Sequence, residues 1–131
     1  RGLGDVYKRQ DWTFEAIIPV PLHKRRLRRR GYNQSALLAE ALSERIGVPV
    51  REELIRRTRN TKTQTSLNAR RRARNLRGAF AASPEAKRMR LLLIDDVRTT
   101  GATLSECARA LREAGAAAVY ACAACERERS D

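Results

Sequence analysis

The feature that most constrains the fold is the stretch LLLIDDVRTTGATLSE at residues 91–106, where four apolar residues run directly into two adjacent aspartates. A short continuous apolar run is typical of a strand in a parallel sheet that is covered on both faces. A Thr/Gly-rich turn comes next, and Leu104, Ala108 and Leu111 then repeat with helical spacing. We therefore expect a buried strand, a tight turn and a helix from about residue 103 to 114.

Other segments alternate between strand and helix patterns. Residues 14–22 (FEAIIPVPL) suit a short buried strand, and residues 33–47 suit an amphipathic helix that Asn33 or Ser35 can cap and Gly47 ends. The basic segment between them reads as a loop. Weaker strand patterns occur at 51–58, 76–80 and 116–124. This alternation predicts an α/β fold with a mainly parallel sheet flanked by helices.

The charge of the chain points to an anionic partner. Its 131 residues include 28 basic and 15 acidic ones, a formal net charge of +13. Nucleic acid, a phosphorylated metabolite and an acidic membrane surface all fit this balance. Because 24 of the basic residues are arginines, the coding bias of a GC-rich genome is an alternative explanation for the total. It explains less well why basic residues cluster in Lys24–Arg30 and Arg70–Arg77.

Several classes of protein are disfavoured by the composition. With 5% aromatic residues the core must be aliphatic. Three cysteines, Cys107, Cys122 and Cys125, do not make a disulfide framework. The pair in CAAC reads as small buried side chains, with a metal or redox site as the alternative. No apolar run approaches the roughly 20 residues that span a bilayer, and no signal peptide is evident, so we expect a cytoplasmic protein without a membrane partner.

The first ten residues, RGLGDVYKRQ, have no periodicity and join poorly to the strand pattern that begins near Phe14. They resemble adapter-derived translation at the end of an environmental sequence fragment, so we exclude them from the fold as a non-native leader. The expected domain is then residues 11–131, with its natural amino terminus missing.

The aspartate pair and the turn after it suit a phosphosugar. Ligands of open parallel sheets bind beyond the carboxyl ends of the strands, where Asp95 and Asp96 are expected. The start of the next helix favours a phosphate, while the carboxylates suit a sugar diol or a hydrated Mg²⁺. The alternative is that the aspartates only end a strand and cap the next helix. The residues expected at the phosphate are Thr99, Thr100, Gly101, Ala102 and Thr103.

The sequence IDDVRTTGATLSE resembles the 5-phosphoribosyl-1-pyrophosphate (PRPP) signature of type I phosphoribosyltransferases. The resemblance implies that fold, with a flexible hood loop over the site. It also implies that Asp95 and Asp96 hold the ribose hydroxyls and that the turn holds the 5-phosphate, with Mg²⁺ bound alongside PRPP rather than in a cage of protein ligands. Arg98 stands at a variable position of the signature, where an aliphatic or aromatic residue is more usual.

Three ordered motifs, PVPLHKRRLRRRGYNQ, TKTQTSLNARRRARNLRGAF and the PRPP signature, are similar to the ComF family of competence proteins over about residues 14–126. That family usually begins with a cysteine-rich zinc-binding segment, which this sequence does not contain. The resemblance places the pyrophosphate near the first motif and the hood at 59–77. It implies that His23, Lys24 and Arg25 face pyrophosphate, although His23 could be an ordinary exposed loop residue, and that Gln64, Arg71 and Asn75 belong to the hood.

These observations support three functional hypotheses. The first is a phosphoribosyltransferase that uses PRPP and Mg²⁺, acts on an unidentified nitrogenous acceptor and releases pyrophosphate. The second is a non-catalytic competence factor that binds single-stranded DNA through Arg28, Arg29 and Arg30, with a competence helicase as partner. The third is a regulator that senses PRPP without chemistry. The sequence leaves the acceptor and the oligomeric state open.

Overall fold

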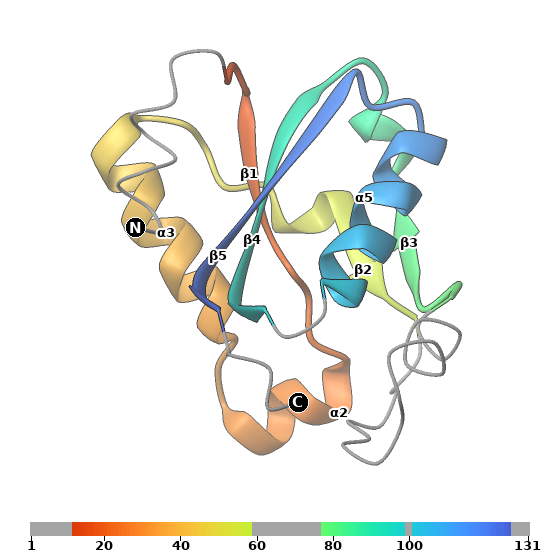
Figure 1. Ribbon diagram of the computed structural model, residues 1–131. Helices are drawn as coiled ribbons and strands as arrows, with labels where there is room; N and C mark the ends of the chain where they lie inside the picture. Colours follow the sequence, from red (N-terminus) through yellow and green to blue (C-terminus); the bar gives the residue numbers. More distant parts are fainter. Residues whose placement is uncertain (1–11, 59–76, 99–100, 127–131) are drawn as a thin grey trace.

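The computed structural model describes residues 12–58, 77–98 and 101–126. Figure 1 shows how its helices and strands are arranged. Its strands are β1 (Ala16–Pro19), β2 (Ile55–Arg57), β3 (Phe80–Ala82), β4 (Arg90–Arg98) and β5 (Ala118–Glu126). Its α-helices are α2 (Lys24–Arg30), α3 (Gln34–Ile46) and α5 (Ala102–Glu113), and two short 3₁₀ turns lie at Glu52–Leu54 and Pro84–Ala86.

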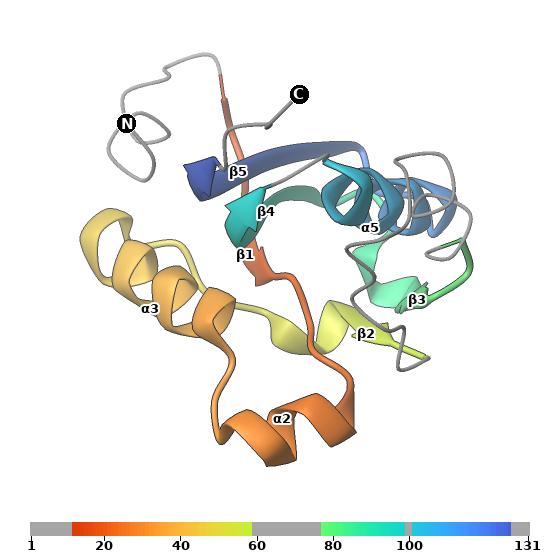
Figure 2. The same cartoon turned by 60° about the horizontal axis from the view of Figure 1, so that its bottom comes forward.

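The central sheet is parallel, with the strand order β1-β4-β5. Ala16 pairs with Leu91 on one side of β4, and Arg90 pairs with Ala118 on the other. Helix α3 covers one face of this sheet and α5 covers the opposite face, as Figures 1 and 2 show. Strands β2 and β3 form a separate antiparallel pair on the α5 side. The expected α/β architecture with a mainly parallel sheet is confirmed.

Strand β4 is buried on both faces because its apolar residues alternate between two cores. Leu91 and Leu93 pack in the cluster that includes α5, whereas Leu92 and Ile94 pack in the cluster that includes α3. All four side chains are fully buried. A period of two within a continuous apolar run gives each face its own aliphatic layer, as the composition predicted.

The basic segment after β1 is helical, which corrects the prediction of a loop. The imidazole Nδ1 of His23 accepts a hydrogen bond from the backbone N–H of Arg25 (3.2 Å) and caps the start of α2. Gly31 (φ 83°) ends it, and its N–H donates to the Leu27 carbonyl (2.7 Å). Arginine, lysine and leucine are good helix formers, and the two local caps bind backbone groups at both ends of this short helix.

The other segments differ from the prediction to varying degrees, and the strand expected at 76–80 forms instead at Phe80–Ala82. Helix α3 is capped by Asn33 and ended by Gly47 in the left-handed region, as expected. The strand predicted at 51–58 is shortened to β2 by the preceding 3₁₀ turn, and it pairs with β3 rather than with the parallel sheet. Next to β1, residues 49–51 run parallel to Ile17, which bonds to the Pro49 carbonyl and to the Arg51 N–H (both 2.9 Å).

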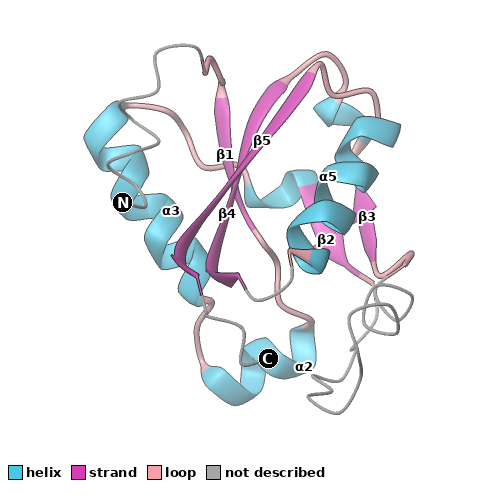
Figure 3. Cartoon of the chain, in the orientation of Figure 1, coloured by secondary structure: helices cyan, strands magenta, loops and turns pink. Residues whose placement is uncertain are grey.

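Figure 3 colours the described residues by secondary structure. The parallel sheet lies between α3 on one face and α5 on the other. The leader predicted at residues 1–10 and the hood residues Gln64, Arg71 and Asn75 lie outside the described residues, so those predictions stay predictions. Within the part that the structure describes, no helix combines the length and the apolar character needed to cross a bilayer.

Candidate functional site

The acid pair lies where the sheet narrows from three strands to two. Pairing between β1 and β4 stops at Pro19 and Ile94, and the Val20 N–H donates the last hydrogen bond to the Ile94 carbonyl (2.9 Å). Asp95 and Asp96 come immediately after, with only β5 beside them. They lie within the last part of β4, as expected. They are thus at the carboxyl edge of the sheet, where open α/β folds bind ligands.

Ser35, in the first turn of α3, reaches the edge of β4 that β1 leaves open. Its hydroxyl donates to Asp95 Oδ1 (3.3 Å) and accepts from the Asp96 N–H (3.2 Å). The same Asp96 N–H also lies 2.9 Å from Asp95 Oδ1. Asp95, Asp96 and Ser35 therefore form one hydrogen-bonded cluster between the sheet and α3.

Burial and like charge both act on Asp95. Removal from solvent raises the pKa of the Asp95 carboxyl from 3.8 to about 6, and the hydrogen bond and negative charge of Asp96 act in the same direction. The Asp96 N–H and the Ser35 hydroxyl oppose this shift in pKa. No cation appears among the groups that set it. The pKa of this carboxyl is thus close to neutral pH. The group can therefore accept a hydrogen bond from a ligand when ionised and donate one when protonated.

The turn that leads to α5 has the geometry expected for close approach to an anion. Gly101 is the N-cap residue and has φ 80°, a backbone conformation that favours glycine. Gly101 has no side chain with which to cap the helix, and Ala102 and Thr103 begin its first turn. Among described residues, the hydrogen bonds from the aspartates to a helix go to Ser35 of α3, which disfavours the alternative that they cap α5. Thr99 and Thr100 lie outside the described residues.

Helix α2 extends beyond the carboxyl edge of the sheet, away from the two layers that cover it (Figure 2). Lys24 and Arg25 are exposed at its start, and Arg28, Arg29 and Arg30 are exposed at its end. None of these five makes an ion pair within the described part of the chain. His23 is half-buried and caps the helix, so the structure gives it a local role beside the predicted contact with pyrophosphate.

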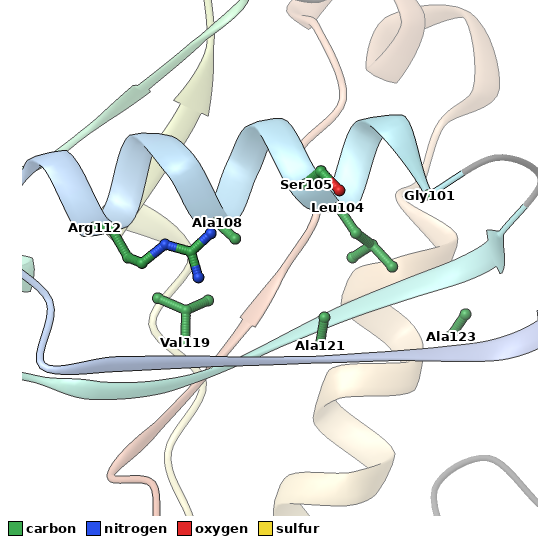
Figure 4. A pocket seen from close by; sticks show the side chains of 8 residues that line it. All are labelled: Gly101, Leu104, Ser105, Ala108, Arg112, Val119, Ala121 and Ala123. Carbon is green, nitrogen blue, oxygen red and sulfur yellow. The ribbon is translucent and has the colours of Figure 1, made fainter. Parts of the chain in front are cut away.

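An open groove of about 370 Å³ runs between α5 and β5 (Figure 4). Gly101 lies at one end and Arg112 at the other, with Leu104 and Ala121 among the residues between them. Neither aspartate lines it. The groove therefore begins at the turn into α5 but does not include the acid pair, which is the better candidate for the functional centre.

The cysteines support no metal centre in the residues that the structure describes. Cys107 is fully buried and Cys122 half-buried, and neither forms a disulfide. Burial raises the pKa of the Cys107 thiol. Among described side chains, no group of three or more His, Cys, Asp or Glu residues could hold an ion. Cys107 is a small core residue. The prediction of small buried side chains concerned the CAAC pair, of which Cys122 is half-buried and the Cys125 side chain lies outside the described set.

Sequence reasoning found the aspartates but missed the part that Ser35 and Asn33 play beside them. Both were predicted only as alternative caps of α3. A signal for Ser35 exists in the helix pattern, because it shares the buried face of α3 with Ala39 and Leu42. A serine at a core position of an amphipathic helix indicates a polar partner across the interface.

Comparison with known proteins agrees with this geometry. Residues 33–131 match the model of the phosphoribosyl transferase domain family. Competence protein F of Haemophilus influenzae is 44% identical over 104 residues, 77% of this chain and 45% of that protein. The DNA utilization protein YhgH of Escherichia coli K12 is 43% identical over 111 residues, 85% of this chain and 49% of that protein.

A solved structure supports the fold alone. The glutamine PRPP amidotransferase of Bacillus subtilis superimposes with a TM-score of 0.59 at 20% identity, covering 91% of this chain and 24% of that one. The chain spans about half the length of the curated relatives it matches. On the family match and these relatives, the chain belongs to the phosphoribosyl transferase domain family and is a homologue of competence protein F and YhgH.

Proposed function

We propose that this chain binds PRPP at the carboxyl edge of its sheet and transfers the phosphoribosyl group to a nitrogenous acceptor, releasing pyrophosphate. One observation carries the proposal. The acid pair of β4 lies at this edge, held by Ser35, and no described cation forms an ion pair with it. In this role the carboxylates of Asp95 and Asp96 accept hydrogen bonds from the ribose hydroxyls.

The phosphate ends of PRPP would be bound on either side of the acid pair. The turn of residues 99–103 leads into α5 and would take the 5-phosphate, with Gly101 allowing close approach. His23, Lys24 and Arg25 would take the pyrophosphate. Since His23 Nδ1 accepts the Arg25 N–H, the neutral ring carries its proton on Nε2 and can donate it to an anion.

The acid pair fits a Mg²⁺ ion that arrives with its substrate. Two adjacent carboxylates supply too few ligands for a complete protein cage, but Mg²⁺ is commonly held by one or two carboxylates, waters and substrate phosphates. When bound there, Mg²⁺ would neutralise charge on the departing pyrophosphate. Asp95 and Asp96 are the residues nearest to such an ion in this proposal.

The chemistry leaves little covalent work to the protein. As the bond from ribose C1 to pyrophosphate breaks, positive charge develops on the sugar, and the acceptor nitrogen attacks C1. The chain must fix the sugar, stabilise the leaving group and exclude water. We assign the first task to Asp95 and Asp96, the second to the residues that begin α2, and the third to the hood with Gln64, Arg71 and Asn75.

Calorimetric titration with PRPP and Mg²⁺ tests the proposal directly. We expect saturable binding by the wild type and none by the Asp95→Asn/Asp96→Asn double variant. The matched control is Glu40→Gln/Glu44→Gln, which removes two exposed carboxylates from α3 and should bind like the wild type. Binding would justify a screen of nitrogenous acceptors for pyrophosphate release. A folded wild type that binds no PRPP would refute the proposal.

Single-stranded DNA binding is the second candidate. It rests on the exposed arginines at the end of α2, which form no ion pair with described residues, and on Tyr32, which is 51% exposed beside them. Arginines on a protein surface can bind the phosphate backbone of nucleic acid, and an exposed aromatic ring can stack on a base. The names of the relatives, a competence protein and a DNA utilization protein, are consistent with it.

Salt dependence is the test of this second function. Replacing Arg28, Arg29 and Arg30 by glutamine should lower the slope of log K against log salt by roughly 0.7 for each lost phosphate contact. The matched control replaces three exposed arginines elsewhere, Arg45, Arg88 and Arg112, with the same change of charge. An equal effect of both triple variants would mean that α2 is not the binding surface.

A further inference from the structure

We propose that Asn33 and Ser35 are positioning residues that hold the acid pair in fixed register with helix α2. The two groups that would bind the ribose and pyrophosphate ends of one PRPP molecule would then keep a constant separation. The inference rests on the proposed phosphoribosyltransferase function and assigns a task to residues that contact no substrate in it.

After Val20 the chain leaves the sheet, forms α2 and returns at Asn33; residues 21–32 are called the excursion below. Both ends of the excursion are bonded through Val20, at the edge of the sheet. At Val20 the chain leaves β1, and the Val20 N–H is bonded to Ile94 in β4. After α2 the chain returns, and Asn33 Nδ2 donates to the Val20 carbonyl (3.1 Å). Both ends of the excursion are therefore tied to the residue next to the last β1–β4 pair.

The side-chain amide of Asn33 both accepts and donates hydrogen bonds. Its Oδ1 accepts from the backbone N–H groups of Ser35 (2.9 Å) and Ala36 (3.4 Å), which caps α3. Its Nδ2 makes the bond to Val20. Aspartate is an equally good cap, but its carboxylate has no donor. Serine also caps well, but it has a single polar atom and lacks the Nδ2 group that bonds to Val20. Capping alone does not account for an amide here, whereas capping combined with closure of the excursion does.

Ser35 continues the same path to the acid pair. It is 4% exposed, and its hydroxyl acts as both donor and acceptor in the bonds to Asp95 and Asp96. A serine inside a helix commonly bonds to its own preceding turn, and alanine is the better helix former. The buried hydroxyl instead makes both of its bonds to β4. It thereby fixes how the Asp95 carboxyl is turned.

The result is one continuous chain of hydrogen bonds from the base of α2 to the carboxylates. It passes from Val20 to Asn33, from Asn33 to Ser35, and from Ser35 to Asp95 and Asp96. Each link joins groups that are at least partly buried. Sites that act on a ligand by orientation depend on such supporting contacts, because a displacement of about 1 Å lowers activity substantially.

Calorimetry with PRPP and Mg²⁺ tests the two residues separately. Ser35→Ala should weaken binding roughly tenfold or more, the effect of losing a hydrogen bond to a charged group. Its control, Ser43→Ala, lies on the same helix and loses a bond from Ser43 Oγ to the Val48 carbonyl (2.6 Å). That control should leave affinity unchanged. Ser35→Thr, which keeps the hydroxyl, should restore binding relative to Ser35→Ala.

For Asn33 the informative variant is Asn33→Ser, which keeps a cap but removes the donor to Val20. We expect α3 to retain its helicity by circular dichroism while PRPP affinity falls. Affinities of Ser35→Ala and Asn33→Ser equal to wild type, in a protein that binds PRPP, would overturn the inference and leave the proposed function standing.

Hydrogen exchange of the Asp96 amide without ligand gives an independent readout. Ser35→Ala should accelerate this exchange on the order of fivefold, as expected for loss of about one hydrogen bond, whereas Ser43→Ala should not. If the wild type bound no PRPP, the proposed function would fail, and the exchange would still decide whether Ser35 positions the pair. Unchanged exchange in Ser35→Ala would refute the positioning role, whatever the ligand.

Discussion

Asp95 places a carboxyl in a setting that opposes its ionisation, and its replacement should stabilise the protein. The folded chain holds its pKa at about 6, against 3.8 for the free side chain. A shift of about two pKa units corresponds to roughly 3 kcal/mol, and the remaining solvent contact of the carboxyl reduces this to about 2 kcal/mol. Asn at this position retains Oδ1 as acceptor for Ser35 and Asp96 but carries no charge.

The sign of the pH dependence is set by proton binding. Between pH 3.8 and about 6 the folded state keeps a proton on Asp95 that the unfolded chain has released. Stability therefore falls as pH rises through this window, and the penalty is complete above it. Glu106 and Glu53 have opposite slopes, because their arginine partners lower the pKa of each carboxyl. Comparison with Asp95→Asn cancels those contributions.

Urea denaturation at pH 7.5 and pH 4 provides the assay. Asp95→Asn should exceed the wild type by about 2 kcal/mol at pH 7.5, a midpoint shift of roughly 1 M, and the difference should vanish near pH 4. Glu40→Gln, an exposed carboxylate on α3, should change neither value. A variant that folds but is no more stable at pH 7.5, or a difference independent of pH, would show that burial does not raise this pKa.

Three further outcomes test other parts of the structure. Leu92→Ala removes a fully buried side chain from the central strand and should cost about 3 kcal/mol in denaturation, whereas Leu37→Ala, at a position 55% exposed, should cost under about 0.5 kcal/mol. Native Cys107 should resist alkylation by iodoacetamide until the protein unfolds, since it is buried and its pKa is raised; rapid labelling in native buffer would contradict its burial. Arg109→Gln breaks solvent-accessible pairs with Glu106 and Glu113 and should lower the urea midpoint only slightly, a difference that 1 M NaCl should shrink; a large loss that salt leaves unchanged would contradict this weak, screened role.

Elements with strong local signals could be predicted from the sequence. The run of β4 is continuous and apolar, and α3 has an asparagine at its start and a glycine at its end. Such signals act between near neighbours in the chain and do not depend on the rest of the fold. The acid pair belongs to the same group, because strand, aspartates and turn are contiguous.

Helix α2, the pairing of β2 with β3 and the bond between Ser35 and Asp96 were not predicted from the sequence. Helix α2 was interpreted as a loop because its sequence is almost entirely cationic, although His23 and Gly31 cap it locally. The antiparallel pairing of β2 with β3 joins segments that are separated by residues 59–76. The bond between Ser35 and Asp96 spans 61 positions. No local propensity specifies such a partner, so only the folded arrangement reveals it.

The charges at the carboxyl edge favour a ligand over a purely structural role. No described cation forms an ion pair with Asp95 or Asp96. Beyond the same edge, no described acid forms an ion pair with the exposed cations of α2, which are Lys24, Arg25, Arg28, Arg29 and Arg30. If both groups served only stability, ion pairs between them would be favourable. Such pairs would offset the cost of burying the aspartates and would reduce the repulsion among the cations of α2. No such pair is formed among the described side chains, and the proposed role of Asn33 and Ser35 is to hold the two groups in fixed register. A molecule with hydroxyl donors at its centre and phosphates at its ends would satisfy both at once, which is the chemistry that PRPP supplies.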